Sequence, residues 1–166
     1  MIADAHVDIL LELAHREHRL GESGVFARTW LPLLEAGGVG LQVCPVFVDL
    51  EWQPEGSLRE ALRQVTALRH AVSESPDRVF QVRSRSDLDE LGKGRIGLMP
   101  PGLSVGATLA GLSGPEHYPA LVEALRRRGW DDERLDGLLA GNLLRFLRES
   151  LPAEDEAATN DDSVSS

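Results

Sequence analysis

A histidine and an aspartate stand two residues apart near the start of the sequence, at His6 and Asp8. They follow the short, mostly apolar run from Met1 to Ala5, which we expect to be a buried strand. Because alternate side chains of a strand point the same way, the two should project together. An imidazole and a carboxylate so placed can both ligate one zinc ion. The plainer interpretation of H-x-D is a polar strand end that caps the next helix.

Other residues with reactive side chains offer weaker candidates. Cys44 falls in an apolar run, which favours a small core residue over a nucleophile. Ser57 and Ser84 are placed to cap helices rather than to attack a substrate. We expect the remaining histidines to be solvated side chains without ligand partners: His15, His18, His70 and His117.

The hydrophobic pattern predicts alternating strands and helices, and therefore an α/β architecture with a parallel sheet. Strands are expected at 1–5, 39–48, 95–99 and 103–109, with a short extended segment at 79–82. Helices are expected at 9–19, 30–36, 57–75, 84–91, 115–128 and 131–147. For the helix after residue 56, the spacing of Ser57 and Glu60 predicts a capping box. Its predicted core face is Leu58, Ala61, Leu62, Val65, Leu68 and Val72.

Composition narrows the class of protein. The chain has 166 residues, 42% of them hydrophobic and 27% charged, which is typical of a globular domain. A net charge of -10 argues against nucleic acid or an anionic membrane as partner, because both require a basic face. One cysteine allows no internal disulfide, and no run approaches the roughly 18 apolar residues of a membrane helix, so we expect a cytoplasmic protein. We expect a folded domain at 1–151 and a disordered acidic tail at 152–166.

Several blocks of sequence, in the same order, resemble the membrane (renal) dipeptidase family of zinc metallopeptidases. The opening D-A-H-V-D-I-L-L-E-L resembles the D-x-H-x-D segment that begins the family's barrel. A second block, L-P-L-L-E-A-G-G-V-G-L-Q, is similar to the family's L-x-x-G-G-V-G-x-Q. Three later blocks resemble a late helix of the family and two of its terminal motifs: 114–121, 128–130 and 141–145. The resemblance as a whole covers most of residues 2–149.

The resemblance implies a partial (β/α)8 TIM barrel whose central segment is missing, since a complete barrel takes about 250 residues. The expected remainder is an open parallel sheet of about four strands flanked by helices, ordered 103–109, 1–5, 39–48 and 95–99. By resemblance the activity is zinc-dependent hydrolysis of dipeptides, with His6 and Asp8 as metal ligands. Exposed strand edges and a bare inner face predict a homo-oligomer or a complementing chain.

The sequence departs from the family where its remaining chemistry is expected. The segment from Gly97 to Gly102 stands where the family has a bridging Glu, and it contains no acidic residue. Thr108 stands where the family has its catalytic Asp. We therefore assign no catalytic residue and expect weak zinc binding and little activity from the chain alone. The alternatives are an active dipeptidase, a non-catalytic relic or binding module, and one part of a split enzyme completed by another chain.

Overall fold

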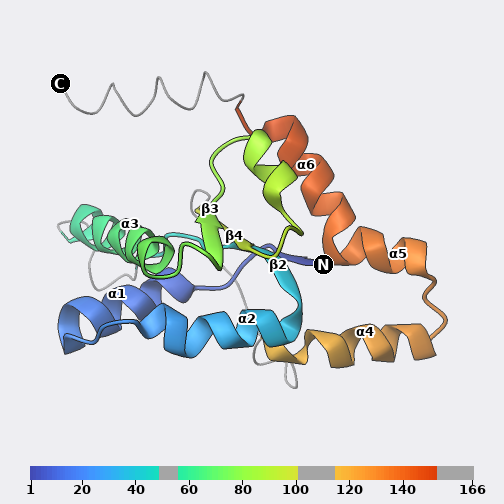
Figure 1. Cartoon of the computed structure of the whole chain (residues 1–166), viewed down its shortest axis with the longest axis horizontal. Coiled ribbons are helices and arrows are strands. Elements are labelled where there is room, and N and C mark those ends of the chain that lie inside the picture. The colour runs from blue at the N-terminus through green and yellow to red at the C-terminus, as the bar shows by residue number, and fades with distance from the viewer. Residues whose placement is uncertain (49–55, 101–114, 153–166) are drawn as a thin grey trace.

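A computed structural model describes residues 1–48, 56–100 and 115–152 of the chain. Within these ranges it contains a parallel sheet of four strands, in the order β1-β2-β4-β3, with helices on both faces (Figure 1). The predicted α/β class and parallel sheet are confirmed. The strands are β1 (Ile2–Asp4), β2 (Val39–Val43), β3 (Val79–Gln81) and β4 (Ile96–Met99).

The helices follow the predicted pattern closely. Proline stands in the first turn of two of them, and glycine at positive φ ends one of these two, at Gly38 (71°), and one other helix, at Gly21 (68°). The α-helices are α1 (Ile9–Leu20), α2 (Leu31–Gly37), α3 (Ser57–Glu74), α4 (Tyr118–Arg127), α5 (Asp132–Asp136) and α6 (Asn142–Ser150). Shorter π or 3-10 segments are η1 (Phe26–Trp30), η3 (Ser86–Glu90), η4 (Pro115–His117) and η5 (Gly137–Gly141).

The sheet agrees with the predicted strand pairing in part. β2 pairs with β1 on one side and with β4 on the other, as expected. β3, which the sequence indicated only as a short extended segment, is a full member of the sheet and pairs with β4. Both faces of β3 are covered, because Val79 and Phe80 are buried in different core clusters. The predicted strand at 103–109, and its pairing with β1, lie outside the described residues.

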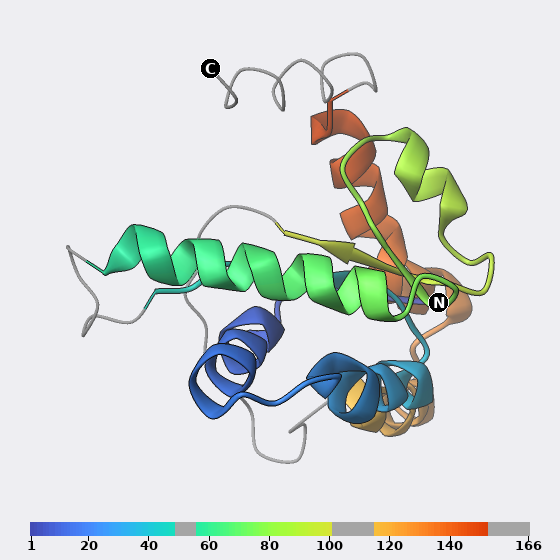
Figure 2. The ribbon, with the colours of Figure 1, turned by 60° about the vertical axis from the view of Figure 1, so that its left-hand side comes forward.

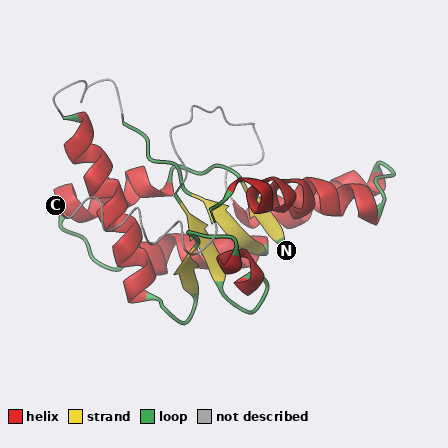
Figure 3. Cartoon of the chain, turned by 90° about the horizontal axis from the view of Figure 1, so that it is seen from above, coloured by secondary structure: helices red, strands yellow, loops and turns green. Residues whose placement is uncertain are grey.

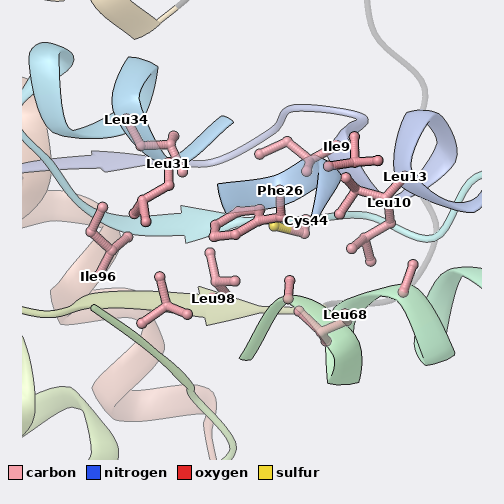
Figure 4. Packing of buried hydrophobic residues seen from close by; sticks show 14 of the residues in the cluster. Ile9, Leu10, Leu13, Phe26, Leu31, Leu34, Cys44, Leu68, Ile96 and Leu98 are labelled. Carbon is pink, nitrogen blue, oxygen red and sulfur yellow. The ribbon is translucent and has the colours of Figure 1, made fainter. Parts of the chain in front are cut away.

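Two clusters of buried side chains cover the two faces of the sheet. One face packs against α1, η1, α2 and α3, where Phe26, Leu68 and Leu98 are almost fully buried (Figure 4). The other packs against η3 and α6, with Leu41 and Leu147 among its buried residues. Figure 2 shows α1 and α2 on one side of the strands and α6 on the other. Figure 3 shows the strands between helical layers. In a closed barrel this second face would line the interior. The expectation that it is bare is wrong, because α6 covers it.

The buried face of α3 differs from the predicted one. Leu58 and Leu62, assigned to the core, are 72% and 57% exposed. Leu68 is buried as predicted, and the other buried residues of the helix are Glu60, Gln64, Ala67 and Ala71. Gln64 donates to the backbone oxygen of Phe47 and accepts from its N–H at 3.0 Å, so it satisfies backbone groups beyond the end of β2. The predicted capping box is also wrong, because the N-cap is Gly56 rather than Ser57.

A β-bulge interrupts the first strand pair. Ile2 is opposite Val39, but Ala3 is opposite Leu41, so Gly40 is an extra residue on β2. As a result Val39 joins the cluster on the α1 face and Leu41 the cluster on the α6 face, although the two are separated by one residue. A side chain at Gly40 would overlap that of Met1.

Candidate metal centre

His6 and Asp8 lie in the connection between β1 and α1, at the carboxyl end of the first strand. β1 ends at Asp4, so the strand geometry from which we predicted their proximity is not what brings them together. The proximity itself is present, because His6 Nε2 is 3.5 Å from Asp8 Oδ1. The backbone between them is held by Val7, whose N–H donates to the Val43 oxygen at 3.4 Å.

The capping role that offered the plainer interpretation of this pair is not seen for the Asp8 side chain. Asp8 occupies the N-cap position of α1, but its carboxylate makes no capping hydrogen bond. The His6 imidazole lies within ion-pair distance of it. The two side chains are 30% and 48% exposed, so both can be reached from solvent.

The separation of the two atoms matches the spacing of neighbouring ligands on a zinc ion. With bonds of about 2.1 Å and tetrahedral angles, two such ligand atoms lie about 3.4 Å apart, against 3.5 Å between His6 Nε2 and Asp8 Oδ1. Zinc in proteins takes four ligands, or three and a water. No group of three or more His, Cys, Asp or Glu side chains that could hold a metal occurs in the parts of the chain that the structure describes. The residues present therefore fit half of a zinc site.

Asp4 links this pair to a distant helix. One of its carboxylate oxygens, Oδ1, accepts the backbone N–H of His6 at 2.9 Å. The other, Oδ2, accepts the hydroxyl of Tyr118, the first residue of α4. Asp4 is only 9% exposed, so both bonds are largely shielded from water. Sequence reasoning missed both roles. Asp4 was visible as the first acid of D-x-H-x-D, but Tyr118 was covered only by the helix expected at 115–128.

The pKa values around Asp4 follow from burial and from its carboxylate. Burial raises the pKa of the Tyr118 hydroxyl, and the hydrogen bond to Asp4 raises it further, so the hydroxyl remains a donor at neutral pH. Burial also raises the pKa of the Cys44 thiol, with a smaller contribution from Asp4. Cys44 is fully buried, which confirms the prediction of a core residue and leaves no accessible thiolate for catalysis.

The other histidines lie away from His6. His15 and His18 are exposed on α1, as predicted. His70 is exposed but has a partner, since its Nδ1 is 3.3 Å from Glu17 Oε2. The His117 side chain is 42% exposed, and its Nδ1 is 3.5 Å from a carboxylate oxygen of its neighbour Glu116.

Of the two predicted departures from the family motif, one lies partly within the described residues and the other lies outside them. The residues from Gly97 to Met99 form the end of β4 and carry no acidic side chain. Pro101, Gly102 and Thr108 lie outside the described residues, so the predicted replacement of a catalytic Asp by Thr108 stays a prediction.

Comparison with known proteins supports the resemblance independently. A family model described as membrane dipeptidase (Peptidase family M19) matches residues 91–161. Over these residues the chain is similar to the membrane dipeptidases. Dipeptidase 3 of Mus musculus is 51% identical over 39 residues, which are 24% of this chain and 8% of the mouse protein. Dipeptidase 3 of Homo sapiens is 43% identical over 47 residues, which are 28% of this chain and 10% of the human protein.

These matches cover only part of this chain and a small part of each relative. Against the dipeptidase 3 proteins, the aligned part spans a tenth or less of the relatives' own length. The match to the membrane dipeptidase model takes in β4 and α4 to α6, and it runs past residue 151, where we expected the acidic tail to begin. His6 and Asp8 lie outside that match, so their assignment rests on the D-x-H-x-D motif and on geometry. No helix in the described ranges is both long and apolar enough to cross a bilayer.

Proposed function

We propose that this chain carries the first metal-binding element of a membrane dipeptidase, with zinc held by His6 and Asp8. The observation that supports it is the 3.5 Å separation of His6 Nε2 and Asp8 Oδ1, with a carboxylate that is not used to cap α1. The reaction class, hydrolysis of dipeptides, comes from the family resemblance.

The chain alone should bind zinc weakly and hydrolyse dipeptides at background level. A bound zinc ion supplies polarisation of the scissile carbonyl and an activated water. Two protein ligands hold such an ion less tightly than the three or four of known sites. We expect a dissociation constant on the order of micromolar or poorer.

A second candidate is one part of a split enzyme, completed by another chain that brings the remaining ligands. Two features favour it over a non-catalytic relic. The ligand pair is open to solvent, at 30% and 48% exposure. The nearby fold also presents large apolar side chains on the outside of α3, where Leu58 and Leu62 are 72% and 57% exposed. Co-purification of a tagged chain with a stable, stoichiometric partner would favour the split enzyme.

Calorimetric zinc titration tests the metal site. The wild-type chain should bind one zinc ion weakly, and the His6→Ala variant should lose that binding. His15→Ala is the matched control, because it removes an exposed histidine of α1 and should leave the isotherm unchanged. Two tight, stoichiometric zinc ions, or an isotherm unaffected by His6→Ala, would overturn the proposal.

A dipeptide hydrolysis assay with added zinc tests the activity separately. The purified chain should release amino acids no faster than buffer with the same zinc concentration. Zinc-dependent turnover that disappears in His6→Ala would show that the chain is a dipeptidase by itself. Such a result would retain the metal site and refute only the predicted inactivity.

A further inference from the structure

The carboxylate of Asp4 holds two groups that are 112 residues apart in the chain, the His6 backbone and the Tyr118 side chain. An aspartate that accepts the N–H two residues on forms a local turn, which fixes the backbone where β1 ends. Such a turn fixes His6 only if the carboxylate itself is held in one orientation. Tyr118 is the side chain that contacts the second oxygen of that carboxylate.

The position of Tyr118 is itself set by packing at the start of α4. Gly37, at the end of α2, lies against the backbone of Pro115, so closely that a methyl group would lie 2.7 Å from the Pro115 carbonyl carbon. Tyr118 follows one turn later and packs against the core cluster on the α1 face. The hydroxyl is therefore carried to Asp4 by a rigid contact between α2 and η4, rather than by a flexible surface side chain.

We propose that Tyr118 is a positioning residue for the metal-binding pair, which acts through Asp4 to fix the His6 backbone and hold the imidazole beside Asp8. This inference rests on the proposed zinc site for its functional meaning. The hydrogen-bonded chain Tyr118–Asp4–His6 makes a prediction that does not depend on metal. Loss of the hydroxyl should disturb His6 in the metal-free protein.

The geometry distinguishes this role from simple core packing. A packing role would need only the ring of Tyr118, which a phenylalanine keeps. The hydroxyl donates to a carboxylate that is 9% exposed, so its removal leaves Oδ2 of Asp4 without this partner in a largely buried site. The carboxylate can then rotate, and the hydrogen bond from the His6 N–H at 2.9 Å loses its fixed acceptor.

The test compares Tyr118→Phe with Ser84→Ala in the full chain. Ser84 is a matched control, because its hydroxyl is 3.1 Å from the carboxylate of Asp87 and the residue is 5% exposed, while it lies beside η3 and not beside His6. Two readouts are measured: the NMR signals of the His6 backbone amide and imidazole without metal, and the affinity for cobalt(II) used as the metal probe. Tyr118→Phe should shift the His6 signals but not those of His15 and His18.

Metal affinity should fall about 3- to 10-fold in Tyr118→Phe, the range expected for loss of one supporting hydrogen bond. Ser84→Ala should change neither readout. In a His6→Ala background, Tyr118→Phe should have no further effect on residual cobalt binding. If Tyr118→Phe fails to fold, Asp4→Asn keeps the shape of the side chain and should produce the same shift of His6.

The outcomes separate this inference from the proposed function. If the wild-type chain binds no metal but Tyr118→Phe shifts the His6 signals, the zinc site fails while the structural role of Tyr118 holds. If metal binds at His6 and neither Tyr118→Phe nor Asp4→Asn changes His6 or the affinity, the positioning role is overturned. An equal effect of Ser84→Ala would also overturn it, because the response would then reflect general loss of stability.

Discussion

Replacement of Gly37 by alanine should disrupt the packing of the segment at the start of α4 against the end of α2. The added methyl group would lie 2.7 Å from the carbonyl carbon of Pro115 and closer still to its oxygen. Both are backbone atoms, so no side-chain rotation relieves the overlap, and η4 or α2 must move. Forced overpacking of this kind costs about 1–3 kcal/mol, and a rigid backbone neighbour favours the upper end, near ~3 kcal/mol. Alanine's higher helix propensity offsets up to about 1 kcal/mol.

The net loss is therefore about 2 kcal/mol of unfolding free energy, or roughly 4–8 °C in Tm for a chain of this length. Gly137→Ala is the matched control. Gly137 also has helical backbone geometry, but its nearest non-local atom would be Asn142 Nδ2 at an ordinary 3.5 Å. That variant should gain up to about 1 kcal/mol. Thermal and denaturant unfolding of both variants measure the difference. A Gly37→Ala protein as stable as wild type would refute the close contact between α2 and Pro115.

Three further predictions follow from described contacts. Leu62→Gln on the exposed face of α3 should change stability by less than about 0.5 kcal/mol, whereas Leu68→Ala should cost about 2–5 kcal/mol in thermal melts; comparable losses in the two variants would support the predicted face, which contained both residues. Asp131→Ala should cost about 1 kcal/mol, because its carboxylate caps α5 through the Arg134 N–H at 2.9 Å, and an unchanged Tm would contradict this. The hydrogen bond from Arg16 lowers the pKa of Glu22 below 4.5, so this pair stabilises the fold above that pH and loses its effect as pH falls through the lowered pKa. Arg16→Gln should reduce the loss of stability at low pH, measured as the Tm over a series of pH values. An unaltered dependence of Tm on pH would contradict the role of this pair.

Local sequence signals predicted most of the helices and the central strands. Glycine at positive φ, proline in the first helical turn and the Asp131 cap each act within a few residues, so they can be read without a fold. The apolar run that became β2 was equally clear. β3 was indicated only as an extended segment, because three residues carry too little periodicity to show that they join a sheet.

The failures have tertiary causes. α3 carries apolar residues on more than one side, so periodicity alone could not show that Leu68 packs into the core while Leu58, assigned to the same face, is exposed. Gln64 determines which side of α3 faces the core, because it is buried where its amide forms hydrogen bonds with the backbone of Phe47. The juxtaposition of His6 and Asp8 was predictable from spacing, although a loop rather than a strand produces it. The contact of Tyr118 with Asp4 was not predictable, because no local pattern connects residues so far apart in the sequence.

The β-bulge at Gly40 makes this edge of the sheet sensitive to the number of residues as well as to their type. Deletion of Gly40 would place Val39 directly before Leu41, and adjacent residues of a regular strand point to opposite faces. Both side chains could therefore keep their present clusters, and the register shift between Ile2 and Ala3 would disappear. Deletion of Gly38 has no bulge to absorb it and would pull Gly37, at the end of α2, away from Pro115. At this edge of the sheet, the position of a deletion therefore decides whether it disturbs β1, α4 and the site between them.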